Sequence, residues 1–192
     1  MNATQAQTAF AQFVEALTAR QAAVPSRDNE ITLSYMTKNE KAIKAGMVKF
    51  PAEVIKGLVD AQKVEAKATD NFIAVKVNVK IVHALAAFGL NSLSALDKYS
   101  HSIIKNIIAL QGLDNLNAQR SICSKIEIDE LDIAKSVKIY HNCSPSTAST
   151  QTSSTREMLR HLDLCQAVKR AKADVIAMRD NKQANMLLTM FA

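Results

Sequence analysis

The sequence predicts a mainly α-helical fold: a compact helical domain, with room for a small β hairpin or sheet, and a C-terminal helix. Only 4 Gly and 3 Pro interrupt the 192 residues. Helix-forming Ala, Leu, Lys and Gln are abundant, and apolar residues recur at helical spacing along most of the chain. Hydrophobic residues make up 48% of the chain, which is enough for a core without metal or disulfide staples.

The helices of the first half follow from apolar spacing and from capping residues. Residues 4–23 carry an apolar stripe and end before Pro25. Thr37 and Glu40 are spaced as a capping box and predict a helix start there. Pro51 suits the first position of a further helix that runs to about Ala68. Residues 26–36 are expected to be irregular, with a short strand at 31–35.

Segment 72–88 carries two periodicities at once. Ile73, Val75 and Val77 alternate with polar or small residues, as in a strand. Val75, Val79 and Val82 also recur at helical spacing. The helix is favoured because no turn residue separates the β-branched start from the alanine-rich end, and the strand stays open as the alternative.

The second half contains a run that predicts a boundary. Ser92 or Ser94 is expected to cap a helix that ends at Gly112, and Asp114 begins a shorter one. Residues 125–140 favour a small hairpin. Residues 144–154 are small, polar and uncharged, which is typical of a mobile linker. We therefore expect a core domain over 1–141, a Ser/Thr-rich linker or long loop over 142–155, and a basic amphipathic helix with an apolar tail over 156–192.

Charge and cysteine usage limit the class of partner and the compartment. The net charge of +6, with a pI of about 9.3, favours anionic partners such as nucleic acid. The 3 Cys are widely spaced and do not form a secreted disulfide framework. No signal peptide is apparent, and no stretch approaches the roughly 18 uncharged apolar residues of a membrane span. A cytoplasmic location is expected, in the host if the protein is viral, with no membrane partner.

Two basic stretches and two aromatic rings are the candidate nucleic-acid contacts. Rows of Lys and Arg neutralise phosphates without reading bases, and exposed rings stack on bases. Solvated helix faces with i,i+4 ion pairs, and packing rings with a wet hydroxyl, explain the same residues and stay open as alternatives. The candidates are Lys41, Lys44, Lys49, Lys56, Lys63, Lys67, Lys76, Lys80, Arg156, Arg160, Lys169, Arg170, Lys172, Tyr35 and Phe50.

No catalytic residue, cofactor or metal site is expected. The phosphate-binding loops, the nucleophile elbow and the zinc-protease motif do not occur in the sequence. Cysteines and histidines occur at Cys123, His141, Cys143, His161 and Cys165, without the paired spacing of a zinc site. The acidic run over 127–132 is interpreted as solvated.

The basic stretch from Lys49 to Lys80, the polar linker and the basic segment from Arg156 to Lys182 together resemble the single-stranded-DNA-binding RNA polymerase cofactors of N4-like bacteriophages. The resemblance implies binding to single-stranded DNA and contact with an RNA polymerase. We expect a non-enzymatic transcription or replication accessory that forms a homo-oligomer through its apolar tail, residues 186–191. The alternative is a helical interaction or assembly protein, such as a phage adaptor or host-factor inhibitor, and DNA is not distinguished from RNA.

Overall fold

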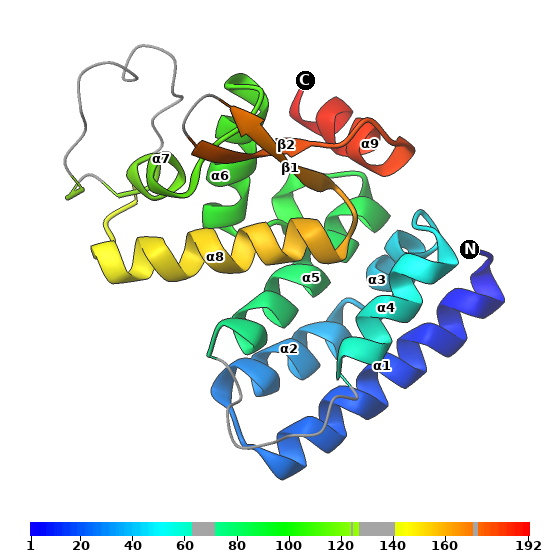
Figure 1. Cartoon of the computed structure of the whole chain (residues 1–192). Coiled ribbons are helices and arrows are strands. Elements are labelled where there is room, and N and C mark those ends of the chain that lie inside the picture. Colours follow the sequence, from blue (N-terminus) through cyan, green and yellow to red (C-terminus); the bar gives the residue numbers. More distant parts are fainter. Residues whose placement is uncertain (63–71, 124, 127–140, 171–172) are drawn as a thin grey trace. The chain divides into compact units, whose positions relative to one another are not determined.

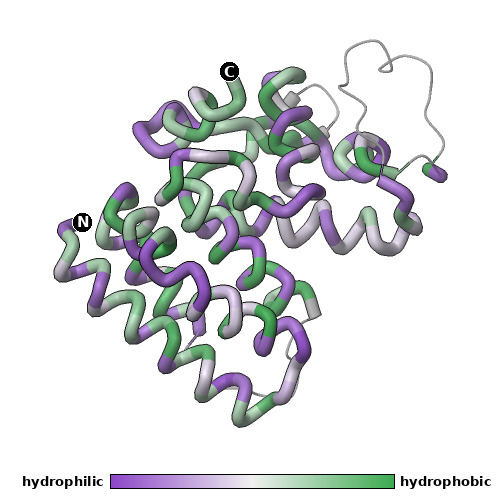
Figure 2. Tube along the Cα trace, turned by 180° about the vertical axis from the view of Figure 1, so that it is seen from behind, coloured by the Kyte–Doolittle hydropathy of each residue, from purple (hydrophilic) through white to green (hydrophobic). Residues whose placement is uncertain are grey.

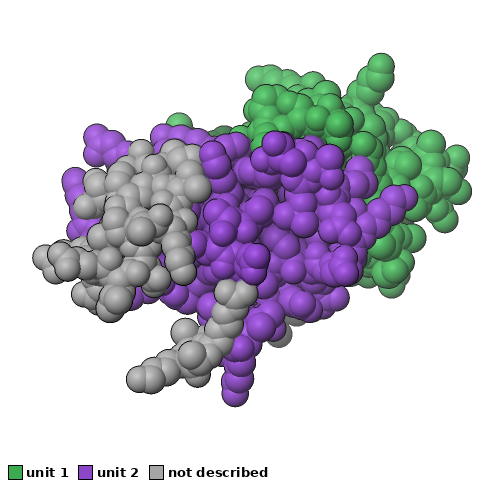
Figure 3. Space-filling view, turned by 90° about the horizontal axis from the view of Figure 1, so that it is seen from above, with its two compact units in different colours: residues 1–96 green, residues 97–192 purple. Residues whose placement is uncertain are grey.

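The computed structural model describes residues 1–62, 72–123, 125–126, 141–170 and 173–192 (Figure 1). The chain divides into two compact units, Met1–Leu96 and Asp97–Ala192, drawn in different colours in Figure 3. The mainly helical class is confirmed, and so are a small two-stranded sheet and a C-terminal helix.

The regular elements that the structure describes in unit 1 are all helices. They are α1 (Ala3–Ala23), α2 (Arg27–Lys38), α3 (Glu40–Met47), α4 (Ala52–Gln62), α5 (Phe72–Leu90) and a 3-10 turn η1 (Leu93–Ala95). The helix over α5 confirms that helical spacing prevails over the strand pattern there. Most of its β-branched residues, Val75, Val77, Ile81 and Val82, are buried in a helical core, so burial decides the conformation.

Helix α1 begins at a capping box that the sequence analysis did not identify. The Asn2 side chain accepts from the Gln5 backbone N–H at 2.8 Å, and the Gln5 side chain accepts from the Asn2 N–H at 2.9 Å. Hydrophobic and hydrophilic residues alternate along this helix in Figure 2, as expected for an amphipathic helix. Phe13 and Leu17 are fully buried against the neighbouring helices.

Helices α3 and α5 pack backbone to backbone at two glycines. A Cβ atom on Gly46 would lie 1.9 Å from the Leu85 carbonyl oxygen, and one on Gly89 would lie 1.8 Å from the Ala42 carbonyl oxygen. Only residues without a side chain permit this approach. Phe50 and Phe88 then meet edge to face beside the crossing, with ring centroids 4.8 Å apart.

Helix α5 is the central helix of unit 1. Among the described residues it alone has a stretch, Ile73–Leu90, that is long and apolar enough to cross a membrane. Of that stretch 61% is buried inside the protein, mainly against α3 and α2. Burial in a core accounts for its apolar character.

Unit 2 combines helices with a β hairpin. Its elements are α6 (Lys98–Ala109), α7 (Asn115–Arg120), α8 (Pro145–His161), β1 (Cys165–Arg170), β2 (Ala173–Met178) and α9 (Lys182–Phe191). Helix α8 packs on α6 and α7, and β2 packs on α6. The core includes Ile103, Ile107, Met158 and Leu159.

The two strands pair in an antiparallel register that places Ala167 opposite Ile176. Ile176 also exchanges both backbone hydrogen bonds with Leu113, at 2.9 and 3.0 Å. Strand β2 is therefore paired on both sides. Because Ile176 bonds to Leu113, its backbone N–H and carbonyl point away from β1, and Ala167 opposite it is not hydrogen-bonded to β2. Hydrogen bonding alternates along an antiparallel strand, so the backbone groups of Ala167 and of Lys169, two residues on, point away from β2.

Two predictions in the first half were wrong in detail. Residues 31–35 are not a strand but lie within α2, where the buried Thr32 and Met36 form its inner face. Thr37 does not cap α3, because α2 continues through it and its hydroxyl donates to the Leu33 carbonyl at 3.0 Å. Helix α3 begins at Glu40 as a new helix after Asn39.

Of the two helix caps predicted in the second half, one was wrong and one was confirmed. Ser92 caps only the 3-10 turn, whereas Asp97 caps α6 by accepting from the Ser100 N–H at 3.0 Å. Asp114 does begin α7, as predicted. The hairpin expected over 125–140 lies almost wholly outside the described residues.

The expected linker over 142–155 was wrong for most of its length. Ser144 accepts from the Thr147 N–H at 3.2 Å, and Pro145 opens α8. Ala148, Thr152 and Thr155 are fully buried. Small hydroxyl side chains allow α8 to lie close to α6, where the Ser100 and Thr155 hydroxyls are 3.1 Å apart. A segment that is too polar to form a core is here one face of a helix–helix contact.

The basic amphipathic helix expected over 156–192 was also wrong. Helix α8 ends at His161, the chain turns at Asp163 with a φ of 56°, and residues 165–178 form the hairpin. The apolar tail is helical in α9, and it packs within unit 2. Ala184 and Leu187 are buried there, and the Phe191 ring lies 5.1 Å from the His101 ring.

Candidate nucleic-acid interface

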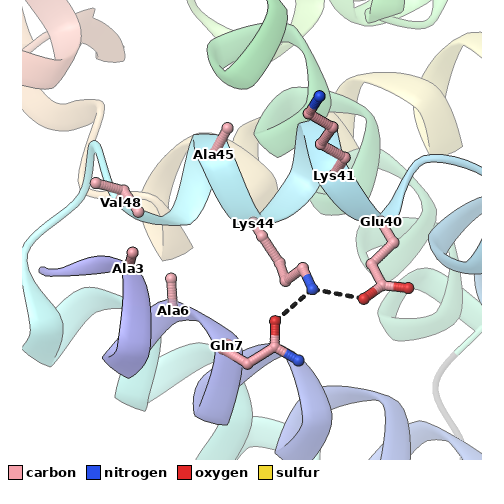
Figure 4. A pocket seen from close by; sticks show the side chains of 8 residues that line it. All are labelled: Ala3, Ala6, Gln7, Glu40, Lys41, Lys44, Ala45 and Val48. Carbon is pink, nitrogen blue, oxygen red and sulfur yellow. Dashed lines mark hydrogen bonds and ion pairs between the residues drawn. The ribbon is translucent and has the colours of Figure 1, made fainter.

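A groove between α1 and α3 brings two of the predicted lysines together. It has a volume of about 440 Å³ and lies wholly within unit 1. Figure 4 shows its small apolar walls and the polar side chains at its edge. The lining residues are Ala3, Ala6, Gln7, Glu40, Lys41, Lys44, Ala45 and Val48.

Lys44 is held across the groove. Its ammonium donates to the Gln7 side chain of α1 and forms an ion pair with Glu40 at 2.5 Å (Figure 4). It also lies 5.6 Å from the centre of the Phe10 ring. These contacts orient the Lys44 side chain, and the ion pair with Glu40 balances its charge. Lys44 is therefore less suited than an unpaired lysine to bind an anion.

Lys41 lies on the exposed side of α3. Its side chain projects away from the Lys44–Glu40 pair (Figure 4). Within the described part of the chain no hydrogen bond or ion pair engages it, and the residue is exposed. Lys41 is therefore the cation of this groove that is best placed to meet an anion.

A second groove lies on the other side of α1, between α1 and α4. Its volume is also about 440 Å³. Lys56 lies at its edge with an exposed side chain and forms an ion pair with Asp60 at 3.3 Å. The remaining lining is uncharged apart from the N-terminus: Met1, Thr4, Gln5, Thr8, Ala9, Gln12, Ala52, Ile55 and Val59.

The other predicted lysines of unit 1 do not extend a basic row. Lys76 forms an ion pair with Asp28 at 2.8 Å, and Lys80 is buried, with 3% of its surface exposed. The prediction that Lys80 contacts phosphate was wrong, because the residue is buried. The charge of Lys76 is already paired with Asp28, which argues against a phosphate contact there. Lys49 is half-buried after α3, and Lys63 and Lys67 lie outside the described residues.

Neither predicted aromatic ring is presented for stacking on a base. Phe50 is buried, with 1% of its surface exposed, and packs on Phe88. Tyr35 already stacks on the His83 ring, with centroids 3.9 Å apart, and its burial raises the pKa of its hydroxyl. Both rings pack on neighbouring rings within unit 1, as in the alternative that the sequence analysis left open.

The predicted cations of unit 2 lie on different elements. Arg156 donates to the Asn115 side chain at 3.0 Å, and Arg160 pairs with Glu157 at 2.6 Å, both from α8. Lys169 is exposed on β1, opposite Asp174. Arg170 ends that strand, and Lys172 lies outside the described residues. The expected single basic helix face does not form.

A serine and a histidine of unit 2 come within hydrogen-bond distance. Ser102 Oγ lies 2.9 Å from His141 Nε2 and also donates to the Lys98 carbonyl at 3.0 Å. Because the hydroxyl has one proton, that second bond makes the histidine the donor, which is the wrong role for a general base. Ser102 is also buried, with 1% exposed, so the pair is structural.

The described residues contain no group of three or more His, Cys, Asp or Glu side chains that could hold a metal ion. No protein-family model, curated protein or solved structure matches the chain. The grooves beside α1 were missed by sequence reasoning, because their walls are alanines and threonines that look like ordinary helix surface. One signal in the sequence could have indicated these grooves: the first predicted helix has no charged side chain before Glu15.

Proposed function

We propose that the protein binds single-stranded nucleic acid, without catalysis, along the groove between α1 and α3. The observation that carries the proposal is an exposed cation, Lys41, at the edge of a groove with small apolar walls. Lysine neutralises a phosphate, and the apolar walls accept the face of a base.

A preference for single strands follows from the same arrangement. Bases in a duplex are stacked inside and cannot reach a groove wall, whereas an unpaired strand turns its bases outward. The walls formed by Ala3, Ala6 and Ala45 carry no donors or acceptors on their side chains. Binding should therefore show little dependence on base sequence.

The test is fluorescence anisotropy with matched single- and double-stranded DNA and RNA of random sequence. We expect single strands to bind more tightly, and affinity to fall steeply between about 50 and 200 mM salt. Lys41→Ala should weaken binding and lower the salt slope by about 1. Lys182→Ala, an exposed lysine at the start of α9, is the matched control.

A second variant tests the apolar wall separately. Ala45→Glu fills the groove and brings a negative charge beside Lys41, so it should remove more affinity than Lys41→Ala. Absence of binding at the lower salt concentration, or an equal loss in Lys182→Ala, would contradict the proposal.

A protein partner is the second candidate function, favoured by the groove between α1 and α4. Its walls include Ala9, Ile55 and Val59, and α1 has no charged side chain before Glu15. Depletion of charge is typical of the centre of a protein interface. Sedimentation at low and high salt tests for self-association here, because apolar association persists as salt rises. Ala9→Lys should abolish it, whereas Lys41→Ala should not.

A further inference from the structure

Two cysteines that are twenty positions apart lie side by side in unit 2. The Cys123 thiol donates to the carbonyl of Cys143, with 3.2 Å between sulfur and oxygen. The Cys143 thiol donates to the carbonyl of Ile122, at 3.5 Å. Each sulfur thus contacts the backbone at or next to the other cysteine.

The local backbone explains how the two residues meet. The His141 N–H donates to the Ile122 carbonyl at 2.9 Å. This bond belongs to an isolated parallel β-bridge in which Cys123 lies beside His141. The Cys143 N–H then donates to the His141 carbonyl at 2.8 Å, two residues earlier. This three-residue turn folds Cys143 back toward Cys123.

We propose that Cys123 and Cys143 form an intramolecular disulfide when the protein meets a small disulfide oxidant such as oxidised glutathione. A thiolate of one cysteine attacks the oxidant, forms a mixed disulfide and expels one reduced glutathione. The second thiolate attacks that mixed disulfide and expels another. Two thiols lose their protons, one S–S bond forms in the protein, and the S–S bond of the oxidant takes up the two electrons.

The remaining cysteine is an internal control. Cys165 lies on β1, is buried, and has a pKa raised by that burial to about 11. Burial also raises the pKa of Cys143, with a further contribution from the neighbouring Cys123. A thiol without a neighbouring thiol can form only a mixed disulfide, so Cys165 should remain outside the crosslink.

The disulfide would close residues 123–143 into a covalent ring. That ring contains the acidic run over 127–132. Because a crosslink restricts the unfolded chain, the oxidised protein should melt at a higher temperature than the reduced protein.

The test is a redox titration of the intact chain in glutathione buffers, approached from the reduced and from the oxidised protein. Free thiols are trapped by alkylation and the crosslink is located by peptide mass mapping. We expect a Cys123–Cys143 link in the wild type and in Cys165→Ser, and none in Cys123→Ser. Since folding holds the two thiols together, the native chain should oxidise at a ratio of oxidised to reduced glutathione at least about tenfold lower than the urea-unfolded chain.

The titration of the urea-unfolded chain is the reference, because there the same two thiols are oxidised without the barrier of burial. A native chain that needs more oxidising buffer than the unfolded chain would overturn the proposal. Equilibration to a product that links Cys165, or to mixed disulfides alone, would overturn it as well.

Discussion

At the scale of single residues, the glycines of unit 1 have opposite roles. Gly46 and Gly89 lie where α3 and α5 touch, and a Cβ atom on either would meet a carbonyl oxygen, at 1.9 and 1.8 Å. Apart from the adjoining backbone of α4, nothing lies within 4 Å of the place where a Cβ atom on Gly57 would be. The first two are required by packing, and the third only weakens its helix.

Substitution of these glycines should separate the two roles. Gly46→Ala forces the helices apart and should lower the free energy of unfolding by about 1–3 kcal/mol. Gly57→Ala should raise it by about 0.5–1 kcal/mol, because alanine has less backbone entropy to lose. Urea unfolding measures both changes, and equal effects of the two substitutions would contradict the close crossing.

Two histidines of unit 2 should make stability depend on pH. Burial lowers the pKa of His101, helped by Lys105, and burial followed by Lys98 lowers the pKa of His141. The unfolded chain therefore binds protons at higher pH than the folded chain does. Stability from this source is present above the unfolded histidine pKa, about 6.5, and is lost as the pH falls from there through the lower pKa of the folded state.

Urea unfolding between about pH 5.5 and pH 8 tests the direction of this dependence, in a range where histidine is the side chain that normally titrates. The urea concentration at the midpoint of unfolding should fall as the pH is lowered. His141→Asn should flatten the curve, whereas His161→Asn, at the exposed end of α8, should leave it unchanged. A midpoint that rises on acidification would contradict the lowered pKa values.

At the scale of elements, α8 shows how hydroxyl side chains build a helix contact. The Thr155 hydroxyl meets that of Ser100 on α6, at 3.1 Å, whereas the buried Thr152 hydroxyl has no hydrogen-bond partner among the described residues. Both threonines are fully buried. The same residue type is thus satisfied at one position of the helix and costs desolvation at the other.

Valine substitutions test this difference on one helix. Thr152→Val removes an unpaired hydroxyl and should be neutral or stabilising, while Thr155→Val breaks a buried hydrogen bond and should cost about 1–3 kcal/mol. Thermal unfolding of the two variants provides the measurement. A larger loss for Thr152→Val than for Thr155→Val would show that the contact is assigned to the wrong hydroxyl.

At the scale of the whole molecule, each unit has its own buried core. Phe13, Leu17 and Leu85 belong to the first, and Ile103, Met158 and Leu162 to the second. A region with its own apolar core can fold alone. The division near residue 96 replaces the boundary expected after residue 141.

Residues 1–96 produced as a separate chain should therefore fold. We expect a helical circular dichroism spectrum and a cooperative urea transition. The same fragment with Gly46→Ala should unfold at lower urea, which links the transition to the α3–α5 crossing. A fragment without a cooperative transition would show that unit 1 depends on the rest of the chain.

The sequence by itself determined the helical class and the positions of most helices. Apolar spacing located α1, α4 and α6, and α5, despite its strand-like composition, was still predicted to be a helix because no turn residue divided it. The local chemistry of capping also located α7 at Asp114. These features depend on neighbours within a few positions, which is the range over which a sequence pattern carries information.

Only the tertiary structure decided the conformation of the Ser/Thr-rich segment and of the hairpin over 165–178. It also decided which of the predicted lysines are buried. Residues 145–154 become helical because α8 packs on α6, which offers Ser100 and an apolar surface. Lys80 is buried because α5 is covered by its neighbours. Likewise, Cys123 meets Cys143 through a backbone bridge between distant positions. The physical reason is the same in each case: burial and long-range hydrogen bonds are set by contacts that local spacing does not contain.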